Sequence, residues 1–138
     1  MHFFKANSSD AHSKSDTSKS IGERAEASAL HFLSTHGLKL ITQNYRVPCG
    51  EIDLIMDDKG TIAFIEVRYR KRSDFGSGAE TVTYSKQKKL TKAALHFIQK
   101  HPKLSKRNFR FDVISISLKG DQFKIDWIDN AFESTLDY

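Results

Sequence analysis

Two apolar runs joined by a short polar turn constrain the fold of this chain more than any other feature. Residues 50–55 and 62–68 are rich in Ile, Leu, Val and Phe, and the tetrapeptide at 57–60, Asp-Asp-Lys-Gly, lies between them. Strand-forming residues on both sides of a polar turn predict a β-hairpin. If Asp58 and Lys59 form a two-residue turn, residues whose numbers sum to 117 face one another across this hairpin.

Both predicted strands carry carboxylates at positions that strand periodicity would otherwise give to the core. In this register Asp53 faces Phe64, and Glu51 faces Glu66. Because side chains alternate between the two faces of a strand, Asp53, Glu66 and Arg68 share one face, with Asp53 and Glu66 diagonal neighbours roughly 7–8 Å apart at the backbone. Unpaired carboxylates beside a buried sheet are costly, and a divalent cation held between them relieves that cost. The hairpin is therefore a candidate metal site.

A third carboxylate lies on the helix predicted over residues 21–36. Glu26 shares a helical stripe with Gly22, Ala29 and Leu33, and that stripe should face the sheet. Two interpretations stay open. Glu26 is either a third metal ligand or a group that orients a metal-bound water, or else it is a carboxylate at the edge of the core whose head reaches solvent.

The remaining segments predict a single α/β domain with the element order αβββαββ. The chain has 138 residues, enough for one domain with a modest core. Residues 1–20 are rich in Ser, Lys and Asp, so we expect a disordered tail there and a single domain over residues 21–138. Its expected elements are a helix over 21–36, a strand over 38–47, the hairpin, a helix over 85–100, and strands over 109–118 and 123–128. Ser20 is a candidate N-cap of the first helix, and Gly37 is its expected stop.

Positive charge is concentrated in the second half of the chain. Residues 67–110 contain thirteen Lys or Arg and two acidic residues, a local charge of +11, whereas residues 21–66 sum to −3 and residues 111–138 to −4. Basic charge beside a carboxylate cluster suits a site that holds a phosphodiester polyanion. The alternative is a solvated surface whose charge is merely uneven along the sequence. The expected contacts to nucleic acid are Arg70, Lys71, Arg72, Lys86 and Lys89.

Composition argues against several other kinds of protein. No apolar run approaches the ~18 residues that a membrane span requires, and the first residues do not form a secretory signal. A lone Cys49 suits a reducing compartment, so we expect a cytoplasmic protein that does not enter a membrane. The six His never occur four residues apart, so the sequence does not predict a His-based zinc site.

The order of these features resembles the PD-(D/E)xK nuclease superfamily. It is most similar to the YraN-like family of uncharacterised bacterial proteins, which are related to Holliday-junction resolvases and restriction endonucleases. The resemblance covers residues 21 to about 133. The blocks that carry it are Gly22-x-x-Ala25-Glu26-x-x-Ala29 with Phe32-Leu33, Gly50-Glu51-Ile52-Asp53-Leu54-Ile55, Phe64-Ile65-Glu66-Val67, Phe75-Gly76, Ser85-Lys86-Gln87 with Lys89-Leu90, Arg110-Phe111-Asp112-Val113, and Asn130-Ala131-Phe132.

The resemblance implies a fold, a site and an activity. The fold is a restriction-endonuclease-like αβββαβ core, a mixed sheet flanked by two helices, with one extra C-terminal strand. The activity is that of a metal-dependent endonuclease that hydrolyses phosphodiester bonds, with DNA favoured over RNA and branched DNA as one substrate. Asp53, Glu66 and Glu26 would hold Mg²⁺ or Mn²⁺, which oxygen-only ligands favour over zinc. Junction-cutting enzymes of this fold commonly work as dimers, which suggests a homodimer.

One residue departs from the superfamily pattern. Most members have a lysine two residues after the acid of the second hairpin strand, and this chain has Arg68. An arginine can stabilise charge on a phosphate but stays protonated, so water activation would fall to the metal alone or to Lys86. The alternative is that Arg68 forms a structural ion pair with Glu66 or Glu51. We also expect the basic loop at residues 70–80 to be mobile and to lie at the mouth of the site.

A different class of function stays open. The same fold and basic surface would also suit a non-catalytic nucleic-acid-binding module with a degenerate nuclease site, and Arg68 is the strongest argument for it. A partner-binding protein without nucleic acid leaves the charge of residues 67–110 unexplained.

Overall fold

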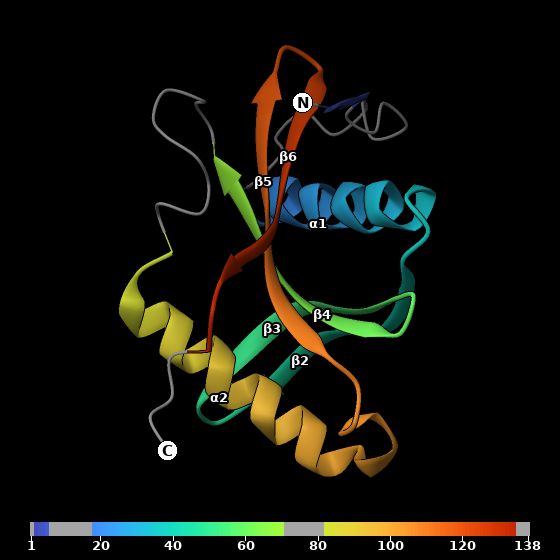
Figure 1. Ribbon diagram of the computed structural model, residues 1–138. Helices are drawn as coiled ribbons and strands as arrows, with labels where there is room; N and C mark the ends of the chain where they lie inside the picture. Colours follow the sequence, from blue (N-terminus) through green and yellow to red (C-terminus); the bar gives the residue numbers. More distant parts are fainter. Residues whose placement is uncertain (1, 6–17, 71–81, 135–138) are drawn as a thin grey trace.

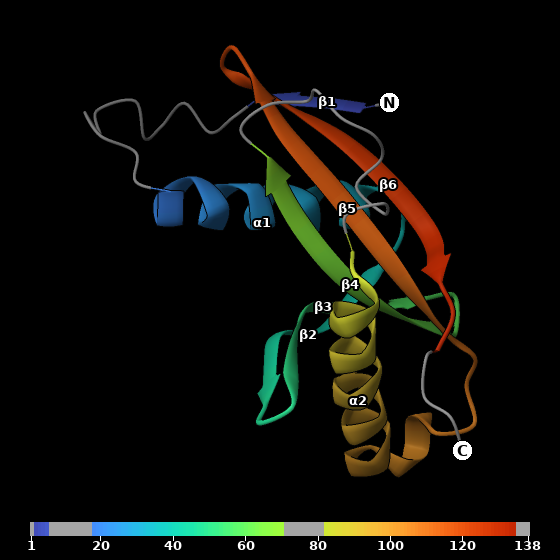
Figure 2. The ribbon, with the colours of Figure 1, turned by 90° about the vertical axis from the view of Figure 1, so that its left-hand side faces the viewer.

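The structure is a mixed sheet with one helix packed on each face (Figures 1 and 2). The computed structural model describes residues 2–5, 18–70 and 82–134. Its elements are β1 (His2–Lys5), α1 (Ser18–Thr35), β2 (Lys39–Val47), β3 (Gly50–Asp58), β4 (Thr61–Arg70), α2 (Tyr84–Lys100), the short 3-10 helix η3 (Pro102–Leu104), β5 (Phe109–Lys119) and β6 (Gln122–Phe132).

The strand order in the sheet is β1-β6-β5-β4-β3-β2. Strands β4 and β5 are parallel, and every other neighbouring pair is antiparallel. A parallel pair needs a long connection, and α2 lies within the segment that joins β4 to β5. The expected αβββαβ core, with a mixed sheet, two flanking helices and an extra C-terminal strand, is confirmed.

The N-terminal segment differs from the expected disordered tail. Residues 2–5 form β1, which pairs antiparallel with β6, and α1 begins at Ser18. Ser20 is therefore inside the helix and is not its N-cap. These four residues were missed because the prediction rested on the composition of residues 1–20 as a whole. They pair with the outer edge of β6 and so satisfy backbone groups that the edge would leave unpaired.

The hairpin of β3 and β4 forms as expected, but its register differs by two residues. Lys59 and Gly60 both have positive φ angles, 53° and 97°, as a type I′ turn requires. The pairs therefore sum to 119, as in Leu54 opposite Ile65. The expected turn at Asp58-Lys59 was wrong because glycine adopts a left-handed backbone conformation more readily than other residues.

The corrected register changes the neighbours of the carboxylates. Because the shift is by two residues, the same side chains still share each face of the two strands. If this register is continued past its last pair, Leu54–Ile65, Asp53 lies opposite Glu66 rather than opposite Phe64. Glu51 does not face Glu66, because the pairs sum to 119 and the β3–β4 ladder ends at Leu54–Ile65. On the other side of β3, Glu51 pairs with Arg46 of β2 at 3.1 Å.

Two apolar clusters hold the helices on the sheet. On α1, Ala25, Ala29, Phe32 and Leu33 are fully buried and pack on one face of the sheet. The helix ends in a Schellman motif, in which the N–H of Leu38 donates to Leu33 O and Gly37 has a φ of 91°. The expected stop at Gly37 is confirmed.

The second helix packs on the opposite face of the sheet. Leu90, Ala93, Ala94 and Phe97 are buried there. The side chain of Thr83 caps the helix by accepting a hydrogen bond from the N–H of Lys86 at 3.1 Å. No helix in the described residues is long and apolar enough to cross a membrane.

A buried aspartate on β5 holds β6 beside it. Asp112 of β5 is 1% exposed and accepts hydrogen bonds from Arg110 Nε at 2.9 and 3.1 Å, from Trp127 Nε1 at 3.1 Å and from the N–H of Asn130 at 2.9 Å. Arg110 also pairs with Asp58 at 2.9 Å. These bonds hold β6 where its register to β5 shifts between Phe111 and Val113, so the Arg-Phe-Asp-Val block has a structural role.

Removal of this carboxylate should be strongly destabilising. Asp112→Ala leaves the half-buried Arg110 guanidinium with Asp58 as its partner, and it leaves the Trp127 indole N–H and the Asn130 N–H without their acceptor. We expect the free energy of unfolding to fall by about 3 kcal/mol. Denaturant unfolding measures this change. Asp121→Ala is the control, because that side chain is exposed and its loss should change stability by no more than ~0.5 kcal/mol. Equal effects of the two substitutions would contradict a structural role for Asp112.

Candidate functional site

The candidate site lies where β3 separates from β4. The ladder between them runs from Asp58–Thr61 to Leu54–Ile65 and ends there, although both strands continue. Figure 2 shows β2 and β3 diverging from β4. Beyond the ladder, the N–H of Val67 donates to Asp53 Oδ2 at 2.8 Å. A carboxylate thus replaces the main-chain acceptor that an unbroken sheet would supply.

The backbone of β2 bends at the same level. Asn44 lies between the pairs Gln43–Leu54 and Tyr45–Ile52 and has a φ of 54°. Opposite it, the alternation of β3 is interrupted. Ile52 packs on the α2 face and Leu54 on the α1 face, although residues two apart normally share a face. Asp53 sits at this interruption, so its carboxylate projects into the opening between the strands.

Asp53 and Glu66 come together in this opening. The two carboxyl groups lie within hydrogen-bonding reach of each other. Burial, then the hydrogen bond to Glu66 and its negative charge, raise the pKa of Asp53 to about 8, and the Val67 N–H opposes this shift only in part. A half-buried and a buried carboxylate within hydrogen-bonding reach of each other hold either a shared proton or a cation.

Lys86 supplies a positive charge beside this pair. Its Nζ lies 3.1 Å from Glu66 Oε2, but the direction of approach does not meet hydrogen-bond geometry. The contact is therefore one of charge, and the oxygen retains capacity for another donor or a cation. Glu66 is 6% exposed, whereas the Lys86 side chain is 44% exposed, so the carboxylate is largely dry while solvent reaches the ammonium group and screens the contact. Sequence reasoning named Lys86 but did not predict its pairing with Glu66.

Glu26 faces Asp53 from the α1 side. Both residues line one cavity of about 390 Å³. Its lining is Gly22, Glu23, Glu26, Asn44, Arg46, Asp53, Val67 and Tyr69. Burial raises the pKa of Glu26, and a hydrogen bond with the Asn44 side chain opposes the shift. Asn44 was not predicted as a site residue, although an Asn within a strand-forming run is a signal of left-handed backbone.

The three expected ligands do not form a complete metal-binding cluster. In the described parts of the chain, no group of three His, Cys, Asp or Glu side chains is placed to hold a metal ion. Asp53 lies close to Glu66, and the Glu26 charge also raises the pKa of Asp53. The roles of Asp53, Glu66 and Glu26 as ligands stay predictions.

Arg68 lies on the same face of β4 as Phe64 and Glu66, by strand alternation. Its Nε is buried without a hydrogen-bond partner among the described residues. In that part of the chain Glu66 pairs with Lys86 and Glu51 with Arg46. The structural ion pair considered for Arg68 is therefore absent there.

The other expected contacts to nucleic acid are only partly described. Arg70 ends β4 and is half-buried, and Lys89 is exposed on α2. Lys71, Arg72 and the rest of the basic loop fall outside the described residues, so the expected mobility of that loop stays a prediction.

Comparison with known proteins assigns the chain to a family. The sequence profile of the uncharacterised protein family UPF0102 matches residues 25–116. The chain belongs to this family. A UPF0102 protein of Stutzerimonas stutzeri is 46% identical over 117 residues, covering 85% of this chain and 98% of the relative. A UPF0102 protein of Coxiella burnetii is 50% identical over 113 residues, and one of Legionella pneumophila is 45% identical over 113 residues. Each of these two matches covers 82% of this chain. They cover 92% of the Coxiella relative and 94% of the Legionella relative.

UPF0102 membership confirms the YraN-like resemblance and its place in the PD-(D/E)xK superfamily. The profile runs from α1 to β5, so it includes Glu26, Asp53, Glu66 and Lys86. The names of the UPF0102 relatives state no activity.

The raised pKa of Asp53 predicts how stability depends on pH. An unfolded Asp loses its proton near pH 3.9, whereas the folded group retains it until about pH 8. Metal-free protein should therefore lose stability as the pH rises between these values. Relative to Asp53→Asn, we expect a loss on the order of 2–4 kcal/mol between pH 5 and pH 8.5, measured by denaturant unfolding in EDTA.

Asp57 provides a control of opposite sign on the same strand. The Gly60 N–H, and then Arg107, lower the pKa of Asp57, so its contribution to stability is present at neutral pH and is lost in acid. Asp57→Asn should therefore weaken the fold at pH 7. A pH profile that is the same in wild type and Asp53→Asn would show that the Asp53 carboxyl is not destabilised by its surroundings.

Proposed function

We propose that this protein is a metal-dependent endonuclease that hydrolyses phosphodiester bonds in DNA. The observation that carries the proposal is the contact between Asp53 and Glu66, in a largely buried opening of the sheet, with Lys86 beside Glu66. A carboxyl group with a raised pKa, as at Asp53, is a common feature of functional sites.

A divalent cation fits this pair of side chains. Asp53 forms no ion pair with a cation among the described residues, and burial and Glu66 raise its pKa. Asp53 and Glu66 offer carboxylate oxygens alone, and Glu26 lines the cavity that contains Asp53. Oxygen donors suit Mg²⁺ or Mn²⁺, so Asp53 and Glu66 would hold the ion with help from Glu26. When bound, such an ion lowers the pKa of a water molecule and offsets negative charge on a phosphate.

Lys86 and Arg68 divide the task that the superfamily usually gives to one lysine. Arg68 provides a permanent positive charge on the Glu66 face of β4 and stabilises charge on the phosphate oxygens. Lys86 adds a second cation beside Glu66, where its charge would offset negative charge on the phosphate, and water activation would fall to the metal ion. Because Lys86 comes from α2, this cation reaches Glu66 from outside the strand.

The surface around the site suits a polyanion. Helix α2 contains five lysines and no acidic residue. Together with Arg70, Lys71 and Arg72, Lys86 and Lys89 of this helix would contact phosphates on both sides of the one that is cleaved.

The proposal predicts metal-dependent cleavage that requires the carboxylates. Purified protein should cut at least one of branched, duplex or single-stranded DNA in Mg²⁺ or Mn²⁺, and EDTA should abolish the reaction. Asp53→Asn and Glu66→Gln should each lower the rate at least ~10²-fold, since charge stabilisers at reacting centres are worth that much. Asp121→Asn is the control and should cleave at the wild-type rate. Cleavage that survives Asp53→Asn in the purified variant would contradict the proposal.

Cleavage should depend on the positive charge of both basic residues. Arg68→Ala should slow cleavage about 10²–10³-fold and leave metal binding intact, while Arg68→Lys should retain activity. Lys86→Gln removes the charge beside Glu66 and should slow cleavage, whereas Lys86→Arg keeps the charge and should retain activity. Cleavage rates and melting temperatures of these variants, with Lys92→Gln as a control on the same helix, test the assignment. If Lys86→Gln lowers only the melting temperature, Lys86 is a structural residue.

A second candidate function is a nucleic-acid-binding module without catalysis. Arg68 in the lysine position favours it, as does the incomplete carboxylate cluster in the described residues. It predicts DNA binding without cleavage, together with a Mg²⁺ titration by calorimetry that Asp53→Asn leaves unchanged.

A further inference from the structure

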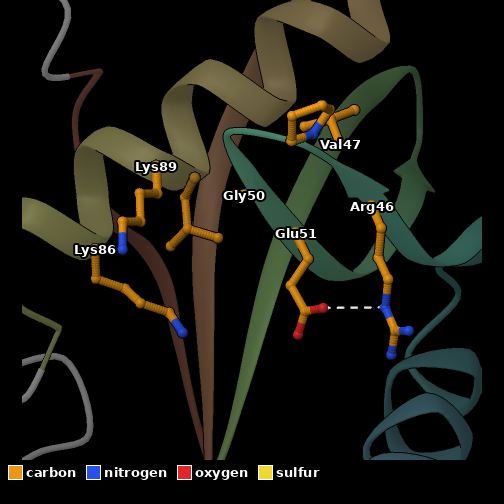
Figure 3. A pocket seen from close by; sticks show the side chains of 8 residues that line it. Arg46, Val47, Gly50, Glu51, Lys86 and Lys89 are labelled. Carbon is orange, nitrogen blue, oxygen red and sulfur yellow. Dashed lines mark ion pairs between the residues drawn. The ribbon is translucent and has the colours of Figure 1, made fainter.

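A second cavity lies between α2 and the β2–β3 hairpin (Figure 3). Its volume is about 380 Å³, within the range of ~300–1,000 Å³ of small-molecule sites. Its lining is Arg46, Val47, Pro48, Gly50, Glu51, Lys86, Lys89 and Leu90. We call it the hairpin pocket. Lys86 joins this pocket to the carboxyl pair, because its Nζ contacts Glu66.

The lining of the hairpin pocket combines two chemistries. Lys86 and Lys89 come from α2 on one wall, and Arg46 lies on the opposite wall (Figure 3). Apolar surface comes from Val47, Pro48 and Leu90. The lining has three cations and one acid, and although Lys86 also contacts Glu66, the remaining excess of positive charge favours an anion. The apolar wall favours an attached ring. A nucleotide has both parts, whereas inorganic phosphate would leave the apolar wall unused.

The pocket is shaped by a close backbone contact. A Cβ at Gly50 would lie 2.7 Å from the carbonyl oxygen of Lys89. The hairpin can therefore approach α2 this closely only with glycine at this position. The contact sets the distance between the two walls.

A weak ion pair lies at one wall of the pocket. Arg46 Nε is 3.1 Å from Glu51 Oε2, and the side chains are 74% and 52% exposed. Exposed ion pairs contribute little to stability. An incoming phosphate can therefore take the place of the Glu51 carboxylate at Arg46 with little loss.

We propose that the hairpin pocket binds one nucleotide of the DNA strand, the one next to the phosphodiester that is cleaved. This inference rests on the proposed nuclease function. The phosphate of this nucleotide lies among Lys89, Lys86 and Arg46, and its sugar and base lie against Val47, Pro48 and Leu90. Lys86 links this phosphate to the neighbouring one at the carboxyl pair, so the pocket sets the position of the strand.

The test measures binding of thymidine 5′-monophosphate without metal. NMR titration in EDTA should show tighter binding of this nucleotide than of thymidine or inorganic phosphate, with shifts at Val47, Gly50 and Leu90. Lys89→Gln should weaken binding about five- to tenfold, the size of one charged hydrogen bond. Lys92→Gln, an equal loss of charge on the same helix outside the pocket lining, should leave it unchanged.

Two further variants separate the pocket from general attraction between charges. Glu51→Gln should tighten binding several-fold, because it releases Arg46. Gly50→Ala should weaken binding with no change of charge, and its NMR spectrum shows whether the variant folds. Lys89→Gln and Glu51→Gln alter exposed side chains, so the test stands without Gly50→Ala.

Two results would overturn the inference. One is equal affinity for the nucleotide and inorganic phosphate, and the other is an equal effect of Lys89→Gln and Lys92→Gln. Because the titration involves neither metal nor cleavage, its outcome is separate from that of the nuclease assay. Cleavage without nucleotide binding would reject only the nucleotide-binding role of the hairpin pocket. Nucleotide binding without cleavage would reject only the proposed nuclease activity.

Discussion

The hydrogen bond from the Val67 N–H to Asp53 is the interaction around which the site is built. Where β3 leaves β4, a half-buried N–H loses its strand partner and needs another acceptor. The Asp53 carboxylate takes that place at 2.8 Å. The same bond brings Asp53 beside Glu66, so the opening in the sheet and the unfavourable carboxyl pair arise together. Lys86 and the apolar packing of α2 offset that cost.

Two aspartates in this sheet show how surroundings separate a structural carboxylate from a functional one. Asp112 accepts from a guanidinium, an indole and a main-chain N–H, and its negative charge is well compensated. Asp53 has one main-chain donor and a second carboxyl group at close range. Both residues interrupt an apolar run in the sequence, and only the structure shows that Asp112 is paired directly with a guanidinium whereas Asp53 lies against a second carboxyl group.

Much of the fold could be predicted from the sequence, because its signals are local. Apolar periodicity located both helices and the hairpin, and the Asp53–Glu66 contact survived an error in the turn because side chains repeat every two residues. The register itself depends on the left-handed backbone at Lys59 and Gly60. The pairing of β1 with β6 and the approach of Lys86 to Glu66 join distant segments, and no local pattern encodes them. The superfamily came from the order of the motifs rather than from any single one.

The position of Lys86 on α2 bears on how the site comes into being as the chain folds. The β3–β4 hairpin is local and precedes α2 in the sequence, so its two carboxylates can meet before any lysine is beside them. In such a partly folded form the acids repel each other and remain solvated. The Lys86 ammonium group comes beside Glu66 only when Leu90, Ala94 and Phe97 of α2 pack on the sheet. The charge arrangement of the site is thus a property of the completed tertiary structure, and a partly folded chain lacks it.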